Sequence, residues 1–171
     1  MAQELFRLKL DRLPSSRASL PLGTSLRFRS PPAAMSGVTC DDECLKKYEQ
    51  IKMKKDLRYI IYTMSEDQKT IVVDSEGDKE KTFADFKDAL PKEEPRYAVV
   101  DFPYKSEDGR DQSKLTFVFW SPDTCGVKKK MLYASSKDAI KKKLTGIMKE
   151  MQCNDEGDLD EDNFTKKMLE K

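Results

Sequence analysis

The sequence predicts an α/β fold of the α+β type, with a central mixed sheet of about five strands flanked by helices on both faces. Short runs rich in β-branched and aromatic residues alternate with segments whose apolar residues recur every three or four positions. The expected order is helix, two strands, helix, two strands, long helix, helix. At 171 residues, the chain suits one domain with a substantial core.

The pattern opens with a helix expected over 41–53, whose acidic first turn complements the helix dipole. Two strands are expected next, over 57–64 and 70–74, because both runs are apolar and β-branched. The polar residues 65–68 between them favour a turn. These two strands would therefore pair as neighbours.

A second helix is expected over 82–90, followed by a strand over 96–102. Thr82 can act as the N-cap, with Asp85 three residues on, and Pro91 stops the helix.

The second half continues with a polar hairpin loop over 106–113 and a strand over 114–120. A proline shortly after this strand breaks the extended run. The chain is expected to end in a helix over 159–169, which carries apolar residues at helical spacing.

The longest helical pattern runs over 127–151, as one helix or as two that meet at Ser135 and Ser136. Its apolar residues predict one buried face: Val127, Met131, Ala134, Ala139, Ile140, Leu144, Ile147, Met148 and Met151. Lysines fill the other faces: Lys128, Lys129, Lys130, Lys137, Lys141, Lys142 and Lys143. This cationic surface predicts an acidic partner.

Composition narrows the classes of function. Charged residues make up 37% of the chain, yet the net charge is only +1, which argues against a globally basic nucleic-acid binder. The sequence has no histidine, which removes histidine-based acid–base catalysis and nucleophile activation. There is no glycine-rich phosphate loop, and no acidic run has calcium-loop spacing. The balance is against an enzyme, a metal site or a cofactor.

Cysteines stand at 40, 44, 125 and 153, without a paired CxxC spacing. Reduced, mostly structural thiols are therefore expected, rather than a disulfide scaffold or a zinc site.

Residues 1–34 differ from the rest, with six Lys/Arg against two acids and frequent Leu, Ser and Pro. Subtracting this +4 from the net charge of +1 leaves −3 for residues 35–171. We expect a disordered N-terminal extension without a fold of its own. Three origins stay open: a disordered tail, an organelle targeting peptide, or upstream sequence included by a gene model that missed a start at Met35.

The run over 120–146, WSPDTCGVKKKMLYASSKDAIKKKLTG, closely resembles the signature of the actin-depolymerising factor/cofilin family. MSGV at 35–38, DLRYIIYTM, RYAVVDF and SKLTFVFWSPD fall where that family has matching segments. The resemblance covers essentially all of residues 35–171 and implies the ADF-homology fold, a mixed sheet flanked by helices. Family members begin at a methionine corresponding to Met35.

The resemblance implies an actin-binding site at the start of the long helix, which in the family enters the cleft between two actin subdomains. The positions that match are Lys128, Lys130 and Met131, with Leu132 behind them. Exposed ion pairs contribute only about 0–1 kcal/mol each, so an apolar anchor is needed at the centre of the interface. For Met131 the alternative is core packing, and for the lysines it is a solvated face.

Ser36, Gly37 and Val38 match a flexible segment that touches the same actin cleft in relatives. Phosphorylation of the matching serine switches actin binding off there, which implies a regulatory kinase and phosphatase. A phosphate adds about −1.5 to −2 charges, which an acidic actin surface would repel.

The resemblance also implies surfaces for filaments and lipids. Basic residues near the final helix and the preceding hairpin match filament-specific contacts, although glutamine replaces a basic residue of some relatives: Arg110, Gln112, Lys114, Lys166 and Lys167. A basic patch at Lys141, Lys142 and Lys143 could bind phosphoinositide head groups in competition with actin.

The expected function is therefore binding of actin monomers and filaments by a monomeric protein, with filament severing, depolymerisation and turnover. Two alternatives are a related protein that binds filament sides or the Arp complex without severing, and a phosphoinositide-binding basic module. The resemblance implies a cytoplasmic location on the cytoskeleton. Nuclear entry stays open, because the basic run 52–55 matches the nuclear-import insert of vertebrate members poorly.

Overall fold

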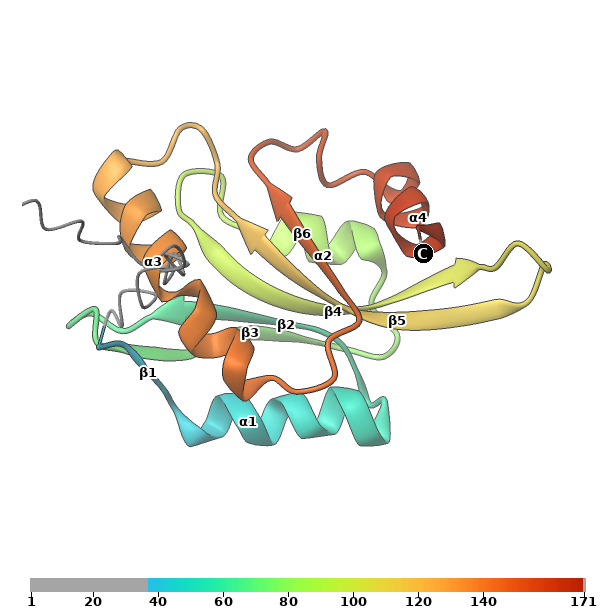
Figure 1. Cartoon of the computed structure of the whole chain (residues 1–171), viewed down its shortest axis with the longest axis horizontal. Helices are drawn as coiled ribbons and strands as arrows, with labels where there is room; N and C mark the ends of the chain where they lie inside the picture. The colour runs from blue at the N-terminus through green and yellow to red at the C-terminus, as the bar shows by residue number, and fades with distance from the viewer. Residues whose placement is uncertain (1–36, 171) are drawn as a thin grey trace, which may run out of the picture. The chain divides into compact units, whose positions relative to one another are not determined.

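The computed structural model describes residues 37–170, which form a mixed six-stranded sheet flanked by helices (Figure 1). The strand order is β1-β3-β2-β4-β5-β6. The extension over 1–34, its boundary at Met35 and the candidate phosphorylation site Ser36 lie outside the described residues. In chain order the elements are β1 Thr39–Cys40, α1 Asp42–Glu49, the π-helix η1 Gln50–Lys54, β2 Leu57–Met64, β3 Thr70–Asp78, α2 Phe83–Ala89, β4 Arg96–Lys105, β5 Asp111–Trp120, α3 Val127–Lys143, β6 Lys149–Cys153 and α4 Glu161–Leu169.

The four long strands are antiparallel neighbours, and the short edge strands β1 and β6 are added in parallel. In β4, Tyr97 pairs with Phe119 of β5, and Ala98 pairs with Val118. Because successive side chains of a strand point to opposite faces, these two pairs supply both layers of the core. The central strands are consequently apolar on both sides.

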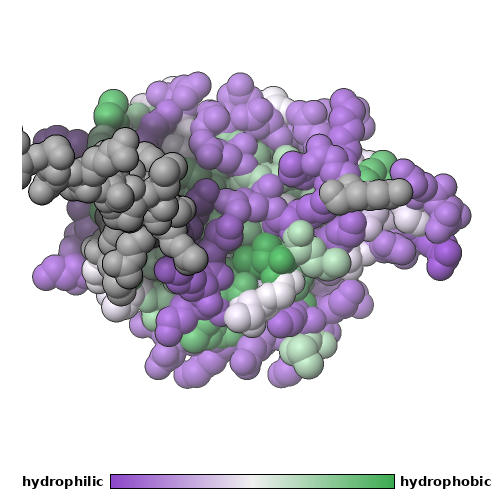
Figure 2. Space-filling model, viewed as in Figure 1, coloured by the Kyte–Doolittle hydropathy of each residue, from purple (hydrophilic) through white to green (hydrophobic). Residues whose placement is uncertain are grey.

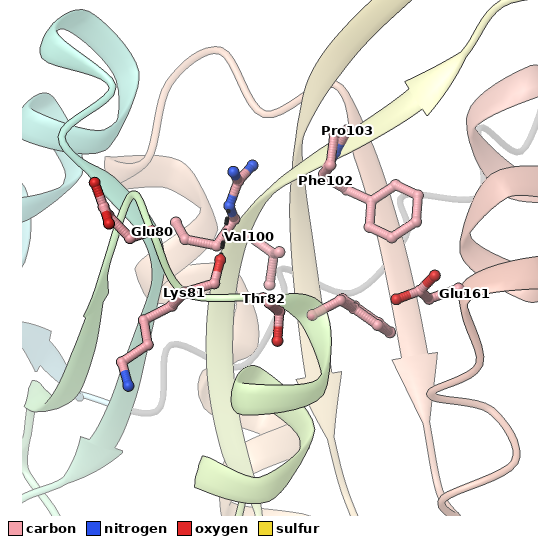
Figure 3. A pocket seen from close by; sticks show the side chains of 9 residues that line it. Glu80, Lys81, Thr82, Val100, Phe102, Pro103 and Glu161 are labelled. Atoms are coloured by element: carbon pink, nitrogen blue, oxygen red, sulfur yellow. Dashed lines mark hydrogen bonds between the residues drawn. The ribbon is translucent and has the colours of Figure 1, made fainter.

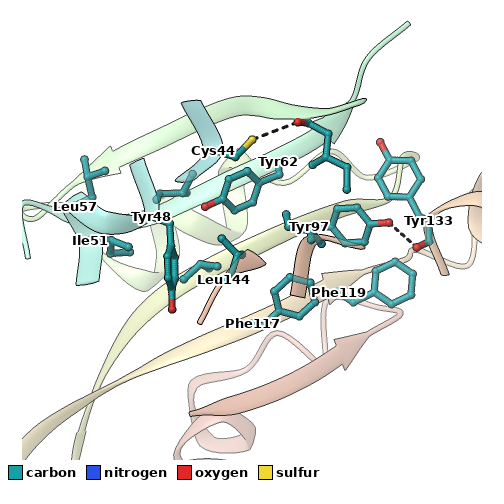
Figure 4. Packing of buried hydrophobic residues seen from close by; sticks show 14 of the residues in the cluster. Cys44, Tyr48, Ile51, Leu57, Tyr62, Tyr97, Phe117, Phe119, Tyr133 and Leu144 are labelled. Carbon is teal, nitrogen blue, oxygen red and sulfur yellow. Dashed lines mark hydrogen bonds between the residues drawn. The ribbon is translucent and has the colours of Figure 1, made fainter. Parts of the chain in front are cut away.

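Helices α1 and α3 cover one face of the sheet, and α2 and α4 cover the other (Figure 1). On the first face, Tyr48, Ile140 and Leu144 of the helical side pack against sheet residues such as Tyr97 and Phe117 (Figure 4). The second face is built around Phe83, Phe86, Phe102, Phe164 and Met168. The α+β architecture with helices on both faces is confirmed, with six strands where about five were expected.

Helix α2 and strand β2 follow the sequence expectations closely, whereas strand β3 is longer than expected. Thr82 is the N-cap of α2, and its side chain and that of Asp85 form a reciprocal capping box. The strand predicted over 70–74 continues through Gly77 to Asp78. A Cβ at Gly77 would lie 2.3 Å from the Tyr59 ring, so only glycine lets β3 pass this aromatic side chain.

The hairpin of β4 and β5 is longer than predicted, because both strands continue past the apolar run. β4 extends to Lys105 and β5 begins at Asp111, which leaves a loop of 106–110 rather than 106–113. The added residues are mostly polar, apart from Pro103 and the buried Tyr104, whose hydroxyl donates to Gln112 across the hairpin at 2.8 Å, so hydrophobic pattern gave little sign of them. Helix α4 likewise starts at Glu161 instead of at 159.

The helix predicted over 127–151 is wrong beyond Lys143. The chain leaves the helix at Leu144, turns at Gly146 with φ of 95°, and enters β6, which pairs in parallel with β5. The Met148 N–H donates to the Leu115 carbonyl at 2.9 Å. β6 reads KEMQC, without a β-branched residue, so its apolar residues matched a helical period by coincidence.

The buried face predicted for the long helix is also wrong in its first half. Val127 and Met131 are 71% and 68% exposed, whereas Tyr133, Ser136 and Ile140 point into the core. The helix runs without a break through Ser135, whose hydroxyl donates to the Leu132 carbonyl at 2.9 Å. The apolar residues at the start of α3 therefore face outward.

All four cysteines are free thiols in this structure. No helix among residues 37–170 is both long and apolar enough to cross a membrane.

Candidate functional site

The candidate site is the first two turns of α3, where apolar side chains stand exposed among lysines. Val127 and Met131 lie one turn apart and are 71% and 68% exposed, and Leu132 beside them is half-buried. Exposed large hydrophobic residues at helical spacing are typical of an interaction surface when polar residues surround them. The solvent-facing start of a well-anchored helix thus presents an apolar strip, which we name the α3 strip and define by Val127, Met131 and Leu132.

Three lysines surround the α3 strip and differ in their partners. Lys129 forms an ion pair with Glu94 at 2.7 Å, and this hydrogen bond raises the pKa of the lysine. Lys130 pairs with Asp123 at 2.8 Å and is partly shielded. Lys128 is exposed and forms no ion pair within residues 37–170. Of the two lysines predicted to contact a partner, Lys128 therefore has the freer charge.

Tyr133 anchors the start of α3 to the sheet. Its hydroxyl accepts the Met64 N–H at 3.0 Å and shares a hydrogen bond with the Thr63 hydroxyl at 3.1 Å. Its backbone carbonyl accepts a hydrogen bond from the Tyr97 hydroxyl (Figure 4). The α3 strip consequently belongs to a fixed surface rather than to a loop.

A hollow of about 290 Å³ adjoins the α3 strip, between α3, the start of β4 and the β2–β3 turn. Leu132 and Tyr133 line it on the helical side, and Glu94 and Arg96 line it on the sheet side. Arg96 pairs with Glu94 at 3.0 Å and with Asp74 at 3.1 Å, so this wall is held by charge-assisted bonds.

The predicted N-terminal contact segment is described only from Gly37 onward, since Ser36 lies outside the described residues. Gly37 is exposed and has φ of 67°, a conformation that favours glycine. Val38 is buried in the core, which removes its side chain from contact with a partner in this conformation. β1 follows directly and lies beside α3 (Figure 1).

The predicted filament residues gather where the β4–β5 hairpin meets α4. Lys114 donates to the Met168 carbonyl at 2.6 Å, with its ammonium 4.8 Å from the centre of the Tyr104 ring. Gln112 accepts the Tyr104 hydroxyl proton at 2.8 Å. Both side chains are thus engaged in hydrogen bonds within the fold. The remaining predicted residues are Arg110, paired with Asp108 at 3.1 Å, Lys167, paired with Glu170 at 2.7 Å, and the exposed Lys166.

The three lysines of the predicted phosphoinositide patch, at the end of α3, differ in whether they form ion pairs. Lys141 forms an ion pair with Glu150 of β6, and Lys137 pairs with the same carboxylate at 2.8 Å. Lys142 and Lys143 are exposed and form no ion pair with any described residue. Lys141 therefore joins α3 to β6, and only its two neighbours carry free charge.

Replacing Glu150 by Gln is expected to destabilise the fold at neutral pH and to have less effect in acid. Burial raises the pKa of Glu150, but hydrogen bonds from Lys137 and Lys141 outweigh it and leave the pKa lowered. A carboxylate with a lowered folded-state pKa contributes stability above its unfolded pKa of about 4.3, and loses it as the pH falls through the folded value.

The measurement is urea unfolding of both proteins from pH 7 down to about pH 3. The difference between wild type and Glu150→Gln should shrink as the pH falls below about 4. Glu107→Gln, in the exposed hairpin loop and without an ion pair among residues 37–170, is the matched control. A difference that persists unchanged in acid would contradict the ionic role of Glu150.

A second hollow, of about 310 Å³, lies on the opposite face of the sheet and has an apolar floor of Phe83, Val100 and Phe102 (Figure 3). The Arg58 guanidinium at its edge donates to the carbonyls of Lys79, Lys81 and Asp101, all at 3.2 Å. These bonds fasten the β3–α2 connection to β4.

The view in Figure 2 is dominated by hydrophilic side chains, consistent with the high charge content.

The mixed sheet, the two helices on each face and the α3 strip together define a binding domain of the ADF-homology class. The family model of the cofilin/tropomyosin-type actin-binding proteins matches residues 37–169, and the chain belongs to this family.

Relatives and solved structures agree with the family assignment. Actophorin of Acanthamoeba castellanii is 39% identical over 128 residues, covering 75% of this chain and 92% of actophorin. Actin-depolymerizing factor 3 of Arabidopsis thaliana is 43% identical over 131 residues, covering 77% and 94%. The crystal structure of Streptomyces griseoflavus cofilin matches with a TM-score of 0.71 and 38% identity, covering 76% and 96%. The solution structure of ADF/cofilin from Trypanosoma brucei gives a TM-score of 0.64 and 36% identity, covering 79% and 96%.

Sequence reasoning missed three residues that shape the site. Val127 was assigned to the core, because an apolar residue at helical spacing favours burial. Asp123 and Glu94, which pair with Lys130 and Lys129, lie outside the helix in sequence and carry no local signal. The run of three lysines at the start of α3 and the family resemblance were the signs that this end of the helix faces solvent.

Proposed function

We propose that the protein binds actin monomers and filaments through the α3 strip and depolymerises and severs filaments. The observation that carries this proposal is the exposure of Met131 and Val127 on a helix that Tyr133 fixes to the sheet. A rigid apolar anchor supplies the desolvated centre that a protein interface needs, and Lys128 supplies attraction to an acidic partner. Membership of an actin-binding family supports the choice of partner.

Depolymerisation follows if the protein prefers one state of actin. A ligand shifts an equilibrium only by its differential affinity for the two states. We infer that it binds ADP-loaded monomers and the sides of filaments and changes filament twist, so that severing and subunit loss increase. The protein would act as a non-enzymatic monomer on the cytoplasmic actin cytoskeleton, and nuclear entry remains an alternative without structural support.

A filament-specific surface is proposed around Lys166 and Arg110, because Lys114 and Gln112 are engaged within the fold. Lys166→Glu is expected to weaken filament binding by roughly fivefold, or about 1 kcal/mol, while monomer binding is retained. Co-sedimentation with filaments and fluorescence titration of monomers measure the two affinities. Lys46→Glu, on the exposed side of α1 across the sheet, is the matched control. Equal losses in both assays would contradict a filament-specific role.

Phosphorylation of Ser36 by a kinase, and its reversal by a phosphatase, is proposed as the regulatory switch. The next residue, Gly37, is exposed, and β1 lies beside α3, which supports this proposal. A phosphate there would add about −1.5 to −2 charges beside a surface that attracts acidic actin. The phosphate would then repel actin and offset the attraction of Lys128.

Binding of phosphoinositide head groups is proposed for Lys142 and Lys143, since Lys141 is paired with Glu150. These two exposed lysines stand at the C-terminal end of α3, about three turns from the α3 strip. Competition between lipid and actin would therefore depend on the bulk of the membrane surface rather than on shared residues.

The test is co-sedimentation with actin filaments, with the soluble actin quantified, for the full-length chain beside residues 35–171. The variant Lys128→Ala/Lys130→Ala in each form locates the site. Binding together with a rise in soluble actin, both lost in the variant, is the expected result. Binding without a rise in soluble actin would favour a protein that binds filament sides or the Arp complex. No binding by either form at moderate salt would overturn the proposal.

A further inference from the structure

We propose that Cys40 and Cys44 form an oxidisable dithiol at the junction of β1 and α1. In this pair Cys40 reacts first with a peroxide, and Cys44 resolves the product into an intramolecular disulfide. This inference does not depend on actin binding, because it concerns only the chemistry of the two thiols and their surroundings.

The two cysteines lie beside one residue of the neighbouring strand. Cys40 is the partner of Ile71 in the parallel pairing of β1 with β3. The Cys44 thiol, in the first turn of α1, donates to the Ile71 carbonyl at 3.3 Å (Figure 4). Cys40 packs against the same core cluster that contains Cys44. Asp41, the extended N-cap of α1, thus joins the two elements so that both cysteines lie beside Ile71, one in a strand and the other in a helix.

The surroundings give the two thiols different reactivity. Cys40 is partly exposed, whereas Cys44 is completely buried. The neighbouring Cys44 side chain and the positive charge of Lys143 lower the pKa of Cys40, against the opposing effects of burial and of Asp41 and Asp42. The neighbouring Cys40 side chain and burial raise the pKa of Cys44. An accessible thiolate beside a protonated, sheltered thiol is the arrangement of an attacking and a resolving cysteine.

The chemistry balances with hydrogen peroxide as the oxidant. The Cys40 thiolate attacks one peroxide oxygen, the O–O bond breaks, and Cys40 becomes a sulfenic acid while hydroxide leaves. Cys44 gives its proton to hydroxide and attacks the Cys40 sulfur, so that the S–S bond forms and the sulfenic oxygen leaves as hydroxide, which takes up the proton that Cys40 released to solvent when it ionised. Two thiols are oxidised by two electrons, and one peroxide is reduced to two waters.

Formation of the disulfide would not leave the Ile71 carbonyl without a hydrogen-bond donor. The Ile71 carbonyl, which accepts from Cys44, also accepts the Asp41 N–H at 2.9 Å, and so keeps a partner after oxidation. The other two cysteines differ, since burial raises the pKa of Cys153 to about 12 and Cys125 is buried at the start of α3. The oxidation should therefore be confined to the pair.

The test uses the full-length chain, treated with hydrogen peroxide, alkylated after denaturation, and digested with trypsin. Cleavage after Arg29 and Lys46 places both cysteines of the pair in a single peptide, without the other two. The expected peptide has lost two hydrogens and resists alkylation, and reduction restores it. Oxidation of Met35 in the same peptide adds an oxygen and is distinguished by mass.

Two variants separate the roles of the cysteines. In Cys44→Ala the sulfenic acid at Cys40 should persist and be captured by dimedone, and in Cys40→Ser the Cys44 thiol should stay alkylatable after peroxide. Circular dichroism of each variant verifies the fold before oxidation. The proposal is overturned if the wild-type peptide keeps both alkylatable thiols, or if Cys44 is oxidised as readily in Cys40→Ser as in wild type. Because mass is the readout, failure here is distinguishable from failure to bind actin.

Discussion

Replacing Met131 by aspartate is expected to abolish measurable binding to actin filaments while leaving the fold intact. Met131 is 68% exposed and lies beside Val127 on a helix that is anchored elsewhere, so its side chain contributes little to stability. A charge at the desolvated centre of an interface costs the apolar contact and adds a buried, unpaired carboxylate. The expected loss is at least ~2 kcal/mol, or about thirtyfold in affinity, measured by co-sedimentation.

Met148→Asp is the matched control, because this methionine is 60% exposed and lies outside α3, in the segment before β6. It should bind filaments like the wild type, and both variants should unfold at the same urea concentration as the wild type. Equal weakening by the two substitutions would mean that charge, rather than the α3 strip, controls binding. Normal binding by Met131→Asp would remove the α3 strip from the proposed site.

The sequence predicted the fold well where hydrophobic pattern and turn chemistry agree. The capping residues Thr82 and Asp85 and the apolar run of β2 each carry a local signal, and the structure confirms both elements. β6 carries no such signal, because its pairing with β5 depends on a partner about thirty residues earlier in the chain. The local sequence pattern therefore failed to predict β6, because this strand forms through its pairing with a distant part of the chain.

For the candidate site, the sequence predicted which residues make up α3, but it did not predict which of them face the sheet and which face solvent. Spacing alone placed Met131 and Val127 in one buried face, yet Tyr133 takes the inward position because its hydroxyl reaches the β2 backbone. Likewise, nothing local distinguishes the paired Lys130 from the unpaired Lys128. The side of an amphipathic helix that is buried depends on the strand against which it packs, and the local sequence does not specify that strand.

The anchoring role of Tyr133 predicts the largest loss of stability at the site. Tyr133→Ala removes a side chain that is 5% exposed and deletes its hydrogen bonds to Met64 and Thr63. Truncation of a buried aromatic residue costs about 3–5 kcal/mol. This is a large share of the roughly 5–15 kcal/mol of a typical domain. Urea unfolding at neutral pH measures the change, and Lys142→Ala, on the exposed side of the same helix, should shift it by less than about 0.5 kcal/mol.

Tyr133→Phe separates packing from hydrogen bonding at this position. The ring remains, but the Met64 N–H loses its acceptor, so a loss of about 1 kcal/mol is expected. The Tyr133 carbonyl still accepts from the Tyr97 hydroxyl, so α3 stays docked and actin binding should remain within about threefold of wild type. If Tyr133→Phe destabilises the fold as much as Tyr133→Ala, the hydroxyl rather than the ring holds the helix. If neither variant changes stability, α3 is positioned by its C-terminal half, through Ile140 and Leu144.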